Sequence, residues 1–143
     1  MKTIKLLLIY LFLSNAFPGL WALFFPGSFY TSFPGMGFHW IDIMGPYSEH
    51  LTRDVGAFFC AIAFLSLFSF FKLEENTLRL TAYATAVFAV PHLVYHICMI
   101  GMFPTLPDKV AGILAIGLNL IVPLLILTLA KKNKLFRPQT IRF

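Results

Sequence analysis

Four long apolar runs constrain the fold of this chain more than any other feature. They cover about residues 6–25, 51–71, 80–103 and 110–130. Each run is long enough to cross roughly 30 Å of hydrocarbon as a helix that rises about 1.5 Å per residue. A helix also satisfies its own backbone hydrogen bonds in lipid, which an isolated strand cannot do. The runs therefore predict an all-α integral membrane protein, folded as a bundle of four transmembrane helices.

The composition supports a membrane protein with one domain over residues 1–143. Only 12% of the residues are charged, whereas soluble domains usually carry about 25%. No Pro- or Ser-rich linker and no charged block divides the chain. The net charge of +5 does not indicate a nucleic-acid partner, because five of the eleven basic residues lie in the tail 131–143: Lys131, Lys132, Lys134, Arg137 and Arg142. Such a tail is typical of contact with anionic lipid headgroups.

The distribution of Lys and Arg predicts that both termini are cytoplasmic. In that orientation the outer side keeps two of the eleven basic residues, Arg53 and Lys109, and the inner side holds the other nine. Cytoplasmic loops of membrane proteins carry such an excess. The aromatic loop 26–50, between the first and second helices, is then expected outside.

The N-terminal run also resembles a signal peptide. A basic start and an apolar core precede Ser14-Asn15-Ala16, which is typical of a signal peptidase site. Hydrophobicity continues to Phe25, a full membrane span. We therefore expect a retained helix, with cleavage as the alternative.

A Phe-Pro-Gly triplet occurs three times, at Phe17, Phe25 and Phe33. We expect the first triplet to bend the first helix and the second to end it, while the third turns the outer loop. The aromatic residues of this loop suit a membrane interface. The loop is interpreted as a packed interfacial segment, or alternatively as a lid over a site.

Two pairs of ionisable residues, His50 with Asp54 and His92 with His96, are each spaced i,i+4 on a predicted helix. Each pair therefore projects from one helix face. Helix rise places both pairs in the outer half of the bundle, together with Asn15 and Asn119. On the third helix the inward stripe is predicted to contain Thr85, Ala89, His92, His96 and Met99.

Three roles for these polar residues stay open, and no catalytic residue can be assigned. First, His50, Asp54, His92 and His96 have the chemistry to ligate Zn²⁺ or a redox metal such as iron, or His92 or His96 to hold haem. Second, a polar pocket binds a hydrophobic, lipid-like or quinone-like molecule, in a setting suited to electron or proton transfer. Its predicted residues are Asn15, Arg53, Asp54, His92, Tyr95, His96 and Asn119. Third, the polar residues specify helix packing, as in a non-catalytic accessory or assembly subunit of a membrane complex.

The two cysteines, Cys60 and Cys98, are not part of a C-x-x-C motif. We therefore interpret them as buried, unreactive thiols rather than a redox centre. Small residues on the second and third helices would also permit homo-oligomers.

The segments GLWALFFPGSFY and EHLTRDVGAFFCAIA resemble the DoxX-like group of small four-helix bacterial membrane proteins. The matching features are Gly19-Leu20, Ala22 and Pro26, then Glu49, Arg53 and Gly56. The resemblance covers the first half of the chain and does not include PHLVYH. It implies a multi-pass protein of the bacterial inner membrane, in a group linked to quinone-coupled oxidoreductase complexes.

Overall fold

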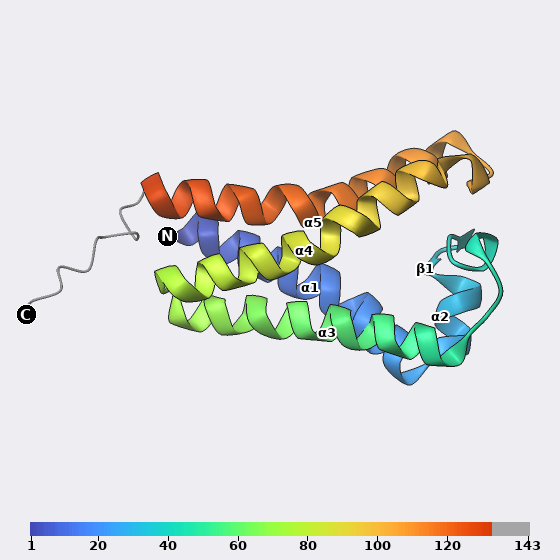
Figure 1. Cartoon of the computed structure of the whole chain (residues 1–143), viewed down its shortest axis with the longest axis horizontal. Helices are drawn as coiled ribbons and strands as arrows, with labels where there is room; N and C mark the ends of the chain where they lie inside the picture. The colour runs from blue at the N-terminus through green and yellow to red at the C-terminus, as the bar shows by residue number, and fades with distance from the viewer. Residues whose placement is uncertain (133–143) are drawn as a thin grey trace, which may run out of the picture.

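The computed structural model describes residues 1–132 and is dominated by helices (Figure 1). Four of the described helices are long and apolar enough to cross a membrane: α1 (Lys2–Phe24), α3 (Glu49–Lys72), α4 (Glu75–Cys98) and α5 (Leu106–Lys132). The prediction of four helices long and apolar enough to span a membrane is thereby confirmed. The third predicted span is too long, because α4 ends at Cys98 and a short 3-10 helix, η2 (Ile100–Met102), follows it. Lys134, Arg137 and Arg142 of the predicted basic tail lie outside the described residues.

The four long helices form two antiparallel pairs, α1 with α3 and α4 with α5 (Figure 1). One end of the bundle holds the N-terminus, the α3–α4 connection and the last turn of α5. The other end, called the α2 end below, holds α2 (Pro26–Ser32), the start of α3 and the connection from α4 to α5.

Two glycines bring α1 and α3 into close contact. A Cβ atom at Gly56 of α3 would lie 2.7 Å from the backbone nitrogen of Leu23, and one at Gly19 of α1 would lie 3.0 Å from that of Cys60. Neither position has room for a larger side chain. The small residue at Gly56 therefore serves close helix packing within one chain.

The hydrophobic core lies toward the N-terminal end of the bundle. Its fully buried members come from three helices: Ile4, Leu8, Leu11, Leu78, Val122, Ile126 and Ala130. Hydroxyl groups add hydrogen bonds between α3 and α4 at the same end, where Ser69 and Thr81 lie 2.8 Å apart and Thr81 donates to the Leu65 carbonyl over 3.1 Å. This end is therefore closed by packing.

At the α2 end, α4 and α5 run away from α1 and α3 (Figure 1). The outer loop lies at this end as α2, a two-stranded hairpin of β1 (Pro34–Gly35) and β2 (Phe38–His39), and the 3-10 helix η1 (Asp42–Met44). The turn of the hairpin has positive φ at Gly35, Met36 and Gly37. The second and third Phe-Pro-Gly triplets act as predicted: α1 ends just before Pro26, which starts α2, and Pro34-Gly35 enters the turn.

Large apolar side chains cover the outside of the long helices. Examples are Leu6, Phe64, Val87 and Leu114, whose exposed fractions are 70, 65, 76 and 58%. A soluble monomer rarely exposes contiguous apolar surface on this scale. The outer surface is compatible with contact with a lipid bilayer.

Candidate functional site

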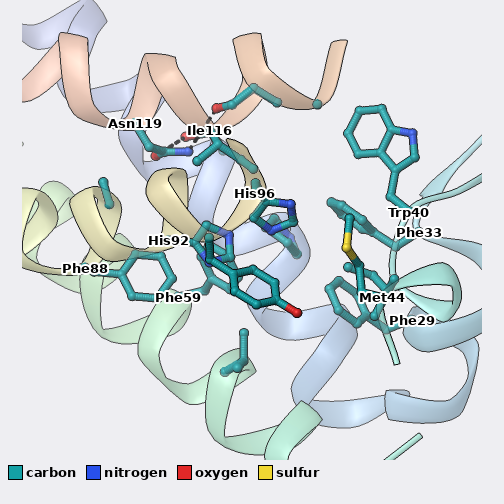
Figure 2. Close-up of a pocket in the computed structure, with 18 of the residues that line it drawn as sticks. Phe29, Phe33, Trp40, Met44, Phe59, Phe88, His92, His96, Ile116 and Asn119 are labelled. Carbon is teal, nitrogen blue, oxygen red and sulfur yellow. Dashed lines mark hydrogen bonds between the residues drawn. The ribbon is translucent and has the colours of Figure 1, made fainter. Parts of the chain in front are cut away.

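A cavity of about 380 Å³ lies between the two helix pairs at the α2 end. This volume falls in the range of small-molecule sites, roughly 300–1,000 Å³. All four long helices and the outer loop contribute to its wall. Figure 2 shows Phe29, Phe33, Trp40 and Met44 of the loop facing the histidines of α4 across it. The outer loop therefore occupies the position of a lid, the alternative interpretation of its sequence.

Aromatic rings form much of the cavity wall. Phe88 stacks on His92 with ring centroids 5.1 Å apart, and Phe59 meets Phe88 edge to face at 5.0 Å. On the loop side, Trp40 and Phe103 are in edge contact at 6.1 Å. Flat apolar walls of this kind favour a ligand with a planar or slender apolar body.

His92 and His96 supply the polar groups on the α4 side of the cavity. Their rings lie 4.6 Å apart, centroid to centroid, and both line the cavity (Figure 2). The predicted inward stripe is confirmed at Thr85, Ala89 and His96, which are buried, whereas His92 is half-buried and Met99 lies beyond the end of α4. His96 is only 8% exposed, and its Nδ1 atom is buried without a hydrogen-bond partner among the described residues. Such an atom is rare in folded proteins.

The histidines lie nearer to the end of their helix than helix rise predicted from the sequence. Because α4 ends at Cys98, His96 is only about 3 Å from the helix end and His92 about 9 Å. Phe103, the end of the predicted span 80–103, instead lies beyond η2. The polar groups are thus close to the loop that covers the cavity.

A second polar cluster lies on the opposite side, between α1 and α5. The Asn15 side-chain amide donates to Asn119 Oδ1 over 2.8 Å, and the Ser14 hydroxyl approaches the same oxygen at 3.5 Å. Ser14 and Asn119 line the cavity, whereas Asn15 lies behind them and is 1% exposed. The predicted convergence of Asn15 and Asn119 is confirmed by this hydrogen bond.

His50 and Asp54 do not join the site. Their side chains are 84 and 52% exposed and pair with each other, His50 Nε2 lying 3.4 Å from Asp54 Oδ2. Neither residue lines the cavity. The predicted four-ligand metal set of His50, Asp54, His92 and His96 is therefore not assembled, and no group of three or more metal-ligating side chains occurs among residues 1–132. The i,i+4 spacing of His50 and Asp54 fixed a shared face, but that face points outward.

Arg53 does not line the cavity either. Its contacts instead join two helices. It pairs with Glu49 at 2.8 Å and donates a hydrogen bond to the Leu23 carbonyl in the last turn of α1. Helix ends leave such carbonyls without intrahelical partners. Arg53 thus fastens the end of α1 to the start of α3, as in the predicted structural role, rather than holding a ligand.

Tyr95 lines the cavity as predicted, with 49% of its surface exposed.

The prediction of two buried thiols is wrong for Cys98, which is exposed, while Cys60 is half-buried against Gly19. Cys98 is exposed because it lies two positions after the buried His96, and residues at this spacing point to nearly opposite faces of a helix.

The outer loop is hydrogen-bonded to α5, a link that was not predicted from the sequence. Trp40 Nε1 donates to Asp108 Oδ1 over 3.0 Å, and Thr105 donates to the other oxygen of the same carboxylate. The Asp108 amide in turn donates to the Thr105 hydroxyl over 3.2 Å. Thr105-x-x-Asp108 before an apolar run is the pattern of a capping box, and it could have marked this helix start.

Comparisons of the chain with protein-family models, curated proteins and solved structures find no match. The resemblance to the DoxX-like group stays a prediction. The function must therefore be argued from the cavity itself.

Proposed function

We propose that this protein is a multi-pass membrane protein that binds one small hydrophobic molecule in the cavity between its two helix pairs. The ligand is lipid-like or quinone-like, with a compact hydrogen-bonding head that contacts His96. The observation that carries this proposal is an apolar cavity of ligand size whose wall includes the rings of His92 and His96. At this wall a neutral imidazole can donate to a ligand carbonyl or accept from a ligand hydroxyl.

The membrane setting belongs to the same proposal. The excess of Lys and Arg on one side favours cytoplasmic termini, and the resemblance to the DoxX-like group implies the bacterial inner membrane. The α2 end and its cavity then lie toward the outer leaflet. The apolar helices and their exposed surfaces support the membrane setting itself.

The test is native mass spectrometry of protein purified in a mild detergent, with extraction and identification of any retained molecule. We expect wild type to retain one stoichiometric lipophile and His96→Leu to lose it. His50→Leu is the matched control, because the same change is made at an exposed histidine outside the cavity. His96→Gln should restore part of the retention, since its amide can replace the imidazole as a hydrogen-bonding group.

Three results would contradict the proposal. One is a wild-type protein that carries only detergent and bulk phospholipid. Another is a His96→Leu variant that retains the same molecule at wild-type stoichiometry. The third is a loss of thermal stability in His96→Leu with no bound species at any stage, which would assign His96 to helix packing.

A further inference from the structure

Part of the cavity wall is also outer surface of the molecule. Leu51 and Val55 of α3 and Tyr95 of α4 line the cavity, yet they are 62, 36 and 49% exposed. Their neighbours that do not line it are equally exposed and mostly apolar, as Phe58 at 63% and Val94 at 55% illustrate. The space between α3 and α4 at the α2 end therefore borders the surface that faces lipid.

The other sides of the cavity are closed by specific contacts. Between α1 and α5, the Asn15–Asn119 hydrogen bond joins the helices. Over the α2 end, Trp40 bonds to Asp108 and packs against Phe103, which is 3% exposed. Toward the N-terminal end lies the hydrophobic core. None of these contacts bridges the gap between α3 and α4, where three large lining side chains are exposed.

The cavity wall also limits the charge of an occupant. Among the described residues that line it there is no Asp, Glu, Lys or Arg. An anionic headgroup placed there would lose its hydration without gaining a fixed counter-charge, which is costly. A neutral head that offers a hydroxyl or a carbonyl would instead find uncharged polar groups in the wall, which belong to Tyr10, Ser14, Trp40, Thr52, His92, Tyr95, His96 and Asn119.

From this geometry we infer a lateral portal between α3 and α4, bounded by Leu51, Val55 and Tyr95, through which a neutral lipophile enters from the bilayer. Its polar head lies at His96, and its apolar tail passes between the two helices into the lipid. This inference rests on the proposed function and adds the charge, the shape and the entry route of the ligand. A water-soluble metabolite would lack a path through this apolar surface.

The experiment uses a decyl benzoquinone that carries a diazirine at the end of its tail, with the full-length protein in phospholipid nanodiscs. After irradiation, labelled peptides are mapped by mass spectrometry, and competition with unlabelled decyl benzoquinone defines the saturable part. We expect saturable labels on the portal segments, residues 49–59 and 92–98, because the tail leaves the cavity there. Untailed benzoquinone should compete poorly.

Val55→Trp tests the portal directly, because a larger side chain fills the gap between α3 and α4. We expect its half-saturating probe concentration to rise by about tenfold or more, equivalent to about 1.4 kcal/mol. Val94→Trp is the matched control, since Val94 is exposed on α4 but does not line the cavity. Leu51→Trp should repeat the effect of Val55→Trp if that variant folds poorly.

The possible outcomes separate the portal from the binding site. Saturable labels in the outer loop, residues 29–44, would overturn the portal and leave ligand binding intact. Equal half-saturating probe concentrations for Val55→Trp and wild type would also overturn the portal and leave ligand binding intact. An absence of saturable labels overturns the portal, and only a wild-type protein that also retains no molecule in native mass spectrometry would overturn the proposed function with it.

Discussion

Asn15 of α1 donates its side-chain amide to Asn119 of α5 over 2.8 Å and thereby joins the two helix pairs across the bundle. The same amide also donates to the Leu11 carbonyl over 2.8 Å, within its own helix. This contact lies on the side of the cavity opposite the gap between α3 and α4. It therefore fixes one pair of helices to the other where the bundle begins to open.

The Asn15–Asn119 contact predicts a measurable coupling energy. Asn119→Leu leaves the Asn15 amide with one partner fewer at a position that is 1% exposed, so we expect it to lower the free energy of unfolding by about 1–2 kcal/mol. In a double-mutant cycle with Asn15→Leu, the coupling should be about 0.6 kcal/mol and not above about 1.7, the range for polar contacts between membrane helices. Reversible unfolding in mixed micelles measures both values. Asn76→Leu, at an exposed position, is the control, and strictly additive single changes would contradict the coupling.

A second prediction concerns the close packing of α1 and α3. Gly56→Ala places a Cβ atom 2.7 Å from the Leu23 nitrogen, so the helices must separate. We expect a loss of about 1–3 kcal/mol, as for other overpacked sites. Gly117→Ala makes the same change in α5, where no atom lies within 4 Å of the added Cβ, and should lose no stability. Thermal melts of both variants check this, and equal melting temperatures would contradict a tight contact at Gly56.

Much of the architecture could be predicted because it depends on local sequence. The length of each apolar run determines whether a helix can span lipid, and this is independent of how the helices pair. Pro26 has no backbone N–H and so ends one helix and starts the next, wherever that helix lies. The i,i+4 spacing of His92 and His96 likewise holds in any straight helix, and both side chains do line one cavity.

The parts that could not be predicted depend on the rotation of each helix about its axis. The spacing of His50 and Asp54 places them on one face of α3, but which face meets the bundle is set by Gly56, which packs on α1. With Gly56 turned inward, Asp54 and His50 are exposed. The bond between Trp40 and Asp108 joins residues far apart in sequence, and only the position of the whole outer loop brings them together.

A third prediction concerns that loop. Trp40→Phe keeps an aromatic ring against Phe103 but removes the hydrogen bond to Asp108. The loss of about 1 kcal/mol should raise amide exchange in residues 33–45 by about fivefold, measured by hydrogen–deuterium exchange. Trp21→Phe is the matched control, because the Trp21 hydrogen bond goes to Ser28 within the same segment of chain. Unchanged exchange in Trp40→Phe would mean that ring packing alone holds the loop on α5.

The last prediction concerns the orientation of the chain in the membrane. With cytoplasmic termini, the β1–β2 turn faces outward and the α3–α4 connection faces the cytoplasm. In a background of Cys60→Ala and Cys98→Ala, a single cysteine at Met36, which is 93% exposed in that turn, should react with a membrane-impermeant maleimide on intact bacterial cells. A single cysteine at Lys72, exposed at the end of α3, should react only after the membrane is made permeable. The reverse pattern would overturn the orientation and place nine of the eleven basic residues outside, against the distribution that membrane insertion favours. It would also move the cavity and its portal to the cytoplasmic leaflet, while the fold and the binding site would stay as described.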